Sequence, residues 1–396
     1  MTSDYERQLP HGLSDLFFAE AAQRTALESG LAETFLRWGY TQVIPPTFEF
    51  YESIAAEAGT QLREELYRFF DRDGRTLALR ADFTIPIARI VATKLYDQPM
   101  PLRFYYIGSV FRHEEPRAGR RREFTQAGIE LIGARTPAAD AEVIALALEA
   151  LRTIGLREVR ISIGQMAFFK ALLADLGLAP EQVAQVKAAI ERRATAQLES
   201  ILRALPMGDE RRHALVQLAG WRHSERWREA AHALCVNAQS HQVIDELTEV
   251  VERLRASVQA DNVLSVDLTA LRGMEYYTGV VFAGFVPGIG YDVVSGGRYD
   301  ELIGHFGKAC PAMGFAIGVE RAMMALPAQN ARLGPDVVAE ACAHAECYEQ
   351  IVAARRAGER VLVDVLGRSG GALRAYAQSL GARVLACRHK GKICEG

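Results

Sequence analysis

An arginine and a glutamate, Arg112 and Glu114, end a strand-like run and open a strongly charged segment. Residues 112–123 contain five arginines and three glutamates. An arginine held at a strand end can direct two N–H donors onto a phosphate, and a basic loop beyond it can supply further positive charge. The segment therefore predicts a local polyanion site. On charge alone, a solvated hairpin loop is the favoured interpretation of the same residues, so the surrounding elements must decide.

Strand-like runs flank the charged segment on both sides. Residues 102–107 (LRFYYI) and 127–133 (AGIELIG) are rich in aromatic and β-branched side chains, which predicts an antiparallel hairpin with a long charged loop. Pro137 suits the first turn of a following helix, which Gly155 ends. Residues 159–164 (VRISIG) are typical of the next strand.

The pattern changes twice more along the chain. Helical periodicity from about 165 to 261 predicts a helical insertion, after which strand-like runs return as NVLSVDL, VVFAGFV, YDVVSGG and AMGFAIGV. We therefore expect an α+β core over residues 1–328, discontinuous in sequence, and a small α/β unit at 329–396. Near the start, Asp15 is the expected N-cap of an amphipathic helix that Gly39 ends.

The composition excludes several classes of protein. The chain has 396 residues, of which 49% are hydrophobic and 24% charged, so it can build packed cores. Its 46 basic and 49 acidic residues give 46 − 49 = −3, which provides no overall attraction to nucleic acid. No run is apolar enough to cross a membrane, and the opening MTSDYERQLP lacks a signal pattern. We expect a cytoplasmic protein.

The six cysteines lie in the C-terminal half without a CxxC pair, which indicates reduced thiols rather than a disulfide framework. Cys342 and Cys347, with His344 between them, lack a second ligand pair at the spacing of a zinc finger. No metal site is therefore predicted.

Five segments in chain order change the interpretation of the charged hairpin. Residues 103–133 resemble motif 2 of class II aminoacyl-tRNA synthetases, and of the histidyl-tRNA synthetase family in particular. The other similar segments are LPHGLSDL (9–16), GYTQVIPPTFE (39–49, motif 1), LRGMEYYTG (271–279, the histidine-specific signature) and the run GGRYDELIGHFG and AMGFAIGVERAM (296–323) into motif 3. The resemblance spans about residues 9–325. It implies an antiparallel sheet flanked by helices and a homodimer formed through motif 1.

The same resemblance implies a pocket for the amino acid histidine. Asp82 and Thr84 fall where the family receives the α-amino group, and Gln126 and Glu130 where it contacts the bound histidine. The remaining pocket residues implied are Arg272, the match of the catalytic arginine, and Tyr276 and Tyr277, which would form a wall around the imidazole. Taken singly, the tyrosine pair is more typical of a core and Arg272 of a surface ion pair with Glu275.

A vestigial ATP site is implied beside the histidine pocket. Arg112 and Arg321 match the paired arginines that hold ATP in class II synthetases, and Glu114 lies close to Arg112 in sequence. No resident cofactor is implied.

Two departures from the active synthetases favour a different function. Residues 80–84 read Arg-Ala-Asp-Phe-Thr where active enzymes carry Arg-Pro-Glu-Gly-Thr, which places the bulky Phe83 beside the site where glycine would allow backbone approach. The segment LRADFTIPIAR and the opening PHGLSD resemble the synthetase-like regulatory subunits of ATP phosphoribosyltransferase. About 70 residues follow motif 3, fewer than the anticodon-binding domain of an active synthetase is expected to need.

Two functions are therefore expected in order. The first is a non-catalytic regulatory subunit that binds L-histidine as effector, assembles with the short-form catalytic subunit of ATP phosphoribosyltransferase and mediates feedback inhibition. It would be a homodimer within a hetero-oligomer and would not use tRNA. The alternative is an active histidyl-tRNA synthetase with a shortened C-terminal domain, since Arg112, Glu114, Arg272 and Arg321 are all retained.

Overall fold

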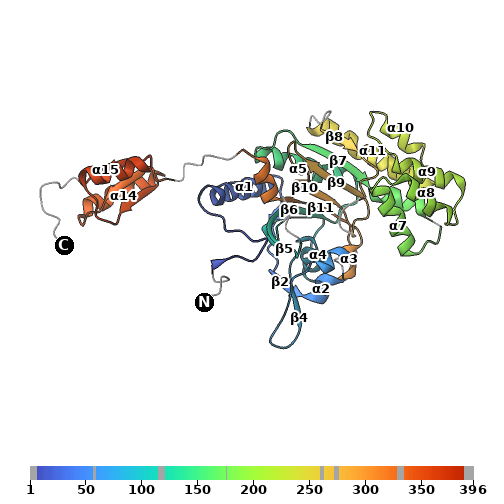
Figure 1. Ribbon diagram of the computed structural model, residues 1–396, viewed down its shortest axis with the longest axis horizontal. Coiled ribbons are helices and arrows are strands. Elements are labelled where there is room, and N and C mark those ends of the chain that lie inside the picture. Colours follow the sequence, from blue (N-terminus) through green and yellow to red (C-terminus); the bar gives the residue numbers. More distant parts are fainter. Residues whose placement is uncertain are drawn as a thin grey trace. The chain divides into compact units, whose positions relative to one another are not determined.

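The computed structural model describes residues 7–56, 59–114, 121–174, 176–258, 263–271, 276–327 and 334–387. Its chain forms two compact units, which Figure 1 shows with their helices and strands. The first unit comprises Met1–Leu16 and Gln23–Ala328, and the second comprises Phe17–Ala22 and Gln329–Gly396.

An eight-stranded sheet forms the centre of the first unit, in the order β1-β5-β6-β11-β10-β9-β7-β8. Its neighbours pair antiparallel except at the two edges, where β1 with β5 and β7 with β8 are parallel. The bounds of the strands are Thr41–Gln42 (β1), Leu102–Phe111 (β5), Glu123–Ile132 (β6), Arg160–Gln165 (β7), Leu264–Val266 (β8), Val280–Phe285 (β9), Val294–Arg298 (β10) and Ala312–Gly318 (β11). The predicted α+β class is confirmed.

The predicted hairpin is confirmed as β5 and β6, and both strands extend further into the charged segment than expected. They pair without interruption from Leu102 opposite Ile132 to Phe111 opposite Glu123. The backbone N–H of Arg112 then donates to the carbonyl of Arg122 at 2.9 Å. The ladder therefore holds Arg112 at its end.

Helices α1 (Phe18–Arg37) and α5 (Pro137–Thr153) contribute to the main core of this unit together with the odd-numbered residues of β6. Thr136 caps α5 by accepting the N–H of Ala139 at 3.2 Å, with Pro137 in the first turn as predicted. The expected N-cap Asp15 is wrong. Because α1 begins at Phe18, Asp15 lies too far upstream to cap it.

Between β7 and β8 the described residues form helices and no strand. These helices are α6 (Met166–Leu173), α7 (Pro180–Glu191), α8 (Thr195–Arg203), α9 (Asp209–Ala219), α10 (Trp227–His232) and α11 (Ala238–Val258). Helix α11 packs on α5 and α6, and the buried side chains of the group continue the main core. Figure 1 shows this helical group beside the β7–β8 edge of the sheet.

A second core lies on the opposite face of β5 and β6, where Tyr106 and Ile132 are buried. A small antiparallel sheet contributes to it, in the order β2-β4-β3 (Phe48–Phe50, Thr76–Leu79 and Arg68–Phe70). The helices on this side are α2 (Tyr51–Ala55), α3 (Gly59–Glu64), α4 (Thr84–Ile90) continued by the π-helical turn η2 (Val91–Leu95), and α12 (Leu302–His305). Helix α13 (Val319–Ala325) follows β11.

The second unit contains a three-stranded parallel sheet in the order β13-β12-β14. Its elements are β12 (Val337–Glu340), α14 (Ala345–Arg356), β13 (Val361–Asp364), α15 (Gly370–Ser379) and β14 (Arg383–Leu385). In this unit the sequence predicts a helix near Ala345–Arg356, a strand RVLVDV, a helix starting near Gly371 and a strand ARVLAC. These four elements are confirmed as α14, β13, α15 and β14, whereas β12 was not predicted. Over the part of the chain that the structure describes, none of the helices has the length and apolarity that a membrane crossing requires.

Candidate functional site

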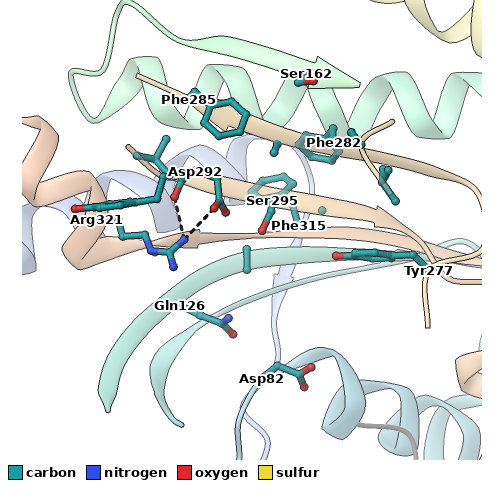
Figure 2. Close-up of a pocket in the computed structure, with 18 of the residues that line it drawn as sticks. Asp82, Gln126, Ser162, Tyr277, Phe282, Phe285, Asp292, Ser295, Phe315 and Arg321 are labelled. Atoms are coloured by element: carbon teal, nitrogen blue, oxygen red, sulfur yellow. Dashed lines mark hydrogen bonds and ion pairs between the residues drawn. The ribbon is translucent and has the colours of Figure 1, made fainter. Parts of the chain in front are cut away.

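A row of small residues crosses five strands on the face of the large sheet opposite α1 and α5. Ser162 on β7 lies opposite Ala283 on β9, which lies opposite Ser295 on β10, then Ala316 on β11 and Gly128 on β6. The four non-glycine members of this row line a cavity of about 790 Å³ (Figure 2). Short side chains on a flat sheet leave room for a ligand, so this row is the floor of the cavity.

The next row on the same face holds a buried carboxyl group. Glu130 lies opposite Gly314, and a Cβ atom at Gly314 would collide with the Glu130 carboxylate. Glu130 is 1% exposed and accepts hydrogen bonds from Thr84 Oγ1 at 2.7 Å and from the hydroxyl of Tyr299. Burial raises the pKa of Glu130 to about 8, although the two hydrogen bonds oppose the rise. Glu130 is therefore largely protonated at neutral pH.

Asp82 precedes helix α4 and lies at the edge of the cavity. Its Oδ1 accepts the N–H of Ile85 at 3.2 Å, which satisfies a free donor of the first helical turn. Its Oδ2 accepts the hydroxyl of Tyr276 at 3.4 Å. Asp82 is 5% exposed, and burial raises the pKa of its carboxyl group against the opposing charge of Arg112. The carboxyl group is thus held in place by the helix that it begins.

Gln126, on β6, is 8% exposed and lines the cavity. Its amide Oε1 is buried without a hydrogen-bond partner. Figure 2 shows Gln126 and Asp82 on the same side of the cavity. A buried acceptor without a donor costs about 1–3 kcal/mol, which a ligand carrying an N–H group would recover.

Tyr276 and Tyr277 form an aromatic wall of the cavity. Their ring centroids lie 5.2 Å apart, and the ring of Tyr276 lies 5.7 Å from that of Tyr299. Both rings also pack against the second core, so the core interpretation and the wall interpretation hold together. Burial raises the pKa of both hydroxyl groups, which keeps them neutral and able to donate. Arg272 lies outside the described residues.

Arg112 lines the same cavity and is held by the chain around it. Its Nε donates to the carbonyl of Ala81 at 2.9 Å, its guanidinium lies 5.4 Å from the ring centre of Phe124, and Glu114 is 3.9 Å away. These contacts fix the arginine at the end of the hairpin.

Arg321, in α13, is paired with an acid in the same cavity. Its NH1 donates to the carbonyl of Asp292 at 3.0 Å and lies 3.2 Å from the Asp292 carboxylate. Figure 2 shows this pair on the side of the cavity opposite Tyr277. The charge of Arg321 is therefore partly neutralised by Asp292.

The structure brings most of the predicted site residues together. Those that line this one cavity are Asp82, Thr84, Gln126, Tyr276, Tyr277, Arg112, Glu114 and Arg321. Glu130 is not among the lining residues and lies behind Thr84, to which it is hydrogen-bonded. Tyr299, which donates to Glu130, was not predicted as a site residue. It belongs to the GGRYDELIGHFG segment, but the sequence of that segment does not indicate which side chain reaches Glu130.

Phe83, the residue that departs from the synthetase pattern, does not line the cavity. It is 2% exposed, and its ring stacks on the ring of Tyr106 with the centroids 4.4 Å apart. The guanidinium of Arg80 lies 4.4 Å from the centre of the Phe83 ring. Tyr106 does line the cavity. The expectation that Phe83 stands beside the site is therefore corrected: Phe83 packs behind Tyr106, which lines the cavity.

Comparisons with known proteins identify the family and the fold of the chain. A family model of histidyl-tRNA synthetase matches residues 12–322. The ATP phosphoribosyltransferase regulatory subunit of Moorella thermoacetica is 47% identical over 82% of this chain and 83% of its own length. That of Symbiobacterium thermophilum is 42% identical over 96% of both chains. The chain belongs to the family of ATP phosphoribosyltransferase regulatory subunits.

Solved structures support the same assignment. A structure described as an ATP phosphoribosyltransferase regulatory subunit/histidyl-tRNA synthetase from Bacillus halodurans is similar with a TM-score of 0.83 and 30% identity, over 96% of this chain and 98% of that one. Histidyl-tRNA synthetase from Nostoc sp. is similar with a TM-score of 0.78 over 96% of this chain and 92% of that one, and at 22% identity it shows the fold alone. The class II synthetase-like fold predicted from the sequence is confirmed.

Membership of the regulatory subunit family decides between the two expected functions. Regulatory subunits of this family belong to histidine biosynthesis and are generally non-catalytic, and their role implies partnership with the catalytic subunit of ATP phosphoribosyltransferase. The regulatory-subunit function of the first hypothesis is therefore confirmed, whereas histidine as the effector, the short form of the catalytic subunit and the homodimer stay predictions.

Proposed function

We propose that this regulatory subunit senses L-histidine in the cavity above the large sheet and passes the signal to the short-form catalytic subunit of ATP phosphoribosyltransferase. The subunit would act in the cytoplasm as a homodimer within a hetero-oligomer. Histidine would reduce catalytic output by binding one state of the complex more tightly than another, with a typical coupling of about 1–3 kcal/mol.

The observations that carry the proposal are an acceptor without a partner and a buried carboxyl group that line the same cavity. The Oε1 of Gln126 has no partner, and Asp82 is a buried carboxyl group whose pKa burial raises. A ligand with an ammonium group and a ring N–H offers donors to both, and a positive charge beside Asp82 relieves the cost of burying the carboxylate. L-histidine carries both groups.

The other predicted pocket residues have complementary roles in the proposal. Tyr276 and Tyr277 would enclose the imidazole, since both line the cavity with neutral rings. Thr84 would link the ligand to Glu130, to which its hydroxyl is bonded at 2.7 Å. Arg272 would face the carboxylate of the ligand, as the family resemblance implies.

The experiment is reconstitution of the full chain with a short-form catalytic subunit, with activity measured across a range of histidine concentrations. Asp82→Asn should weaken inhibition about ten- to hundred-fold, because a hydrogen bond between charged groups is worth about 1.5–3 kcal/mol. Glu149→Gln, at an exposed position of α5, is the matched control and should leave the curve unchanged. Calorimetry on each variant measures histidine binding directly. If the parent chain binds no histidine, alone or in the complex, the sensor proposal fails.

The alternative function, aminoacylation of tRNA, makes an opposite prediction. Arg112 and Arg321 would have to hold ATP, whereas Arg321 lies 3.2 Å from the carboxylate of Asp292 and Arg112 donates to Ala81. We expect these residues to be vestiges of an ATP site. Formation of histidyl-tRNA above a no-enzyme control would favour the synthetase instead.

A further inference from the structure

The parallel sheet of the second unit has a change of direction between two of its strands. The chain passes from β12 through α14 to β13 on one side, and then through α15 to β14 on the other side of β12. The loop after β12 therefore leads away from β14, although the two strands are neighbours. In parallel sheets the space outside the carboxyl ends of such a strand pair is a crevice where ligands bind.

Three cysteines meet in this crevice. Cys342 follows β12, Cys387 follows β14, and Cys347 lies in the first turn of α14. The Sγ of Cys387 is 3.2 Å from that of Cys342 and 3.6 Å from that of Cys347. All three sulfur atoms lie within 4.8 Å of one another. Cys347 is 7% exposed, and the other two are half-buried.

The spacing of the sulfur atoms suits a shared metal ion better than a disulfide. Sulfur atoms around tetrahedral zinc lie about 3.8 Å apart, given a Zn–S bond of about 2.3 Å, whereas a disulfide bond is about 2.05 Å long. A disulfide would also use two of the three thiols and leave the third. Three soft sulfur ligands favour zinc over the hard cations magnesium and calcium.

Two features of the backbone lie beside the sulfur atoms. The N–H of His344 donates to the Sγ of Cys342 at 3.4 Å. Cys347 lies in the first turn of α14, a helix of 12 residues whose amino end attracts negative charge. Both features lie at the carboxyl edge of the sheet, where the three sulfur atoms meet.

We infer that Cys342, Cys347 and Cys387 form a zinc site at the carboxyl edge of the second unit, with the fourth position taken by solvent or another donor. Along the sequence only Cys342, His344 and Cys347 are near one another, so no metal site was predicted. Cys387 lies 40 residues beyond Cys347 and approaches it through the strand order.

The test uses the full chain, purified under reducing conditions without chelator and then loaded with Zn²⁺ or Co²⁺. We expect one zinc per chain by elemental analysis, and a sulfur-to-cobalt charge-transfer band in the near ultraviolet with Co²⁺. Cys342→Ser and Cys387→Ser should lose the metal and the band. Cys310→Ser, which changes a cysteine in the first unit, is the control and should retain both.

A second group, formed by His232, Cys235 and His241, could also bind metal. The assay must therefore distinguish metal bound by this group from metal bound by the three cysteines. The variant His241→Asn removes that group, so zinc retained by it belongs to the three cysteines. The inference is overturned if His241→Asn alone abolishes binding, if Cys342→Ser and Cys387→Ser bind metal fully, or if the reduced chain binds none. Circular dichroism distinguishes loss of the ligand from loss of the fold. A folded chain that carries both His241→Asn and Cys342→Ser and still keeps its zinc also refutes the site.

Discussion

Replacing Glu130 by glutamine should change how the stability of the chain depends on pH. The carboxyl group of Glu130 ionises at about 8 in the folded chain, against an ordinary value of 4.5 for its pKa. Between these pH values the folded state holds a proton that the unfolded state has lost. The contribution of Glu130 is therefore full below about pH 4.5 and is lost as the pH rises through 8.

The size of the effect follows from the same two values. At about 1.4 kcal/mol per pH unit, ionising Glu130 costs about 5 kcal/mol of folding free energy over the whole interval and about 3 kcal/mol by pH 7. Glutamine resembles the protonated carboxyl group, since it offers one oxygen and one donor to Thr84 and Tyr299. Glu130→Gln should thus match the parent chain at pH 5 and exceed its stability at pH 8.

The assay is urea unfolding at several pH values, followed by tryptophan fluorescence. The three tryptophans are Trp38, Trp221 and Trp227, all in the first unit, so the signal reports the unit that contains Glu130. Glu149→Gln is again the control. The reasoning is refuted if the stability difference between Glu130→Gln and the parent chain does not change between pH 5 and pH 8.

Three further outcomes are expected. Gln126→Leu should weaken histidine binding about three- to ten-fold in calorimetry without loss of stability, because it removes a buried acceptor that has no partner; unchanged affinity would contradict its role. Histidine binding near pH 7.5 should release protons, measured as a dependence of the binding enthalpy on the buffer, because a cation in the cavity lowers the pKa of Glu130 from its raised value of about 8; no dependence would exclude an effect of the ligand's charge on Glu130. The side chains of the ion pair between Arg298 and Asp140 are 6% and 8% exposed. Arg298→Met should therefore lower the unfolding free energy by about 3–5 kcal/mol, because it leaves Asp140 as an unpaired buried acid. Adding Asp140→Leu should restore part of that loss.

Local patterns in the sequence predict the elements that carry the site, but not the contacts across them. The hairpin of β5 and β6 follows from runs of aromatic and β-branched side chains, and helix α5 follows from a proline in a first turn. β12 was not predicted. β5 was predicted to end too early, at 107, and β6 to begin too late, at 127, because the runs of aromatic and β-branched side chains stop before the charged segment, although the ladder continues into it.

The depth of Glu130 could not be read from its spacing to Gln126. Both residues point to the same face of β6, yet Glu130 is covered by Thr84 and Tyr299, which come from distant segments. The meeting of Cys387 with Cys342 likewise depends on strand order, which spacing along the chain does not reveal.

Different residues of the cavity set the size of a ligand and recognise its polar groups. Ser162, Ala283, Ser295 and Ala316 limit the depth of the cavity by their small volumes, whereas the polar acceptors stand elsewhere on its walls. A single exchange of Ala283 for valine would make the space shallower and leave every polar side chain in place. Related proteins could in this way come to select a different metabolite by adding or removing one or two methyl groups, without rebuilding the polar contacts that orient it.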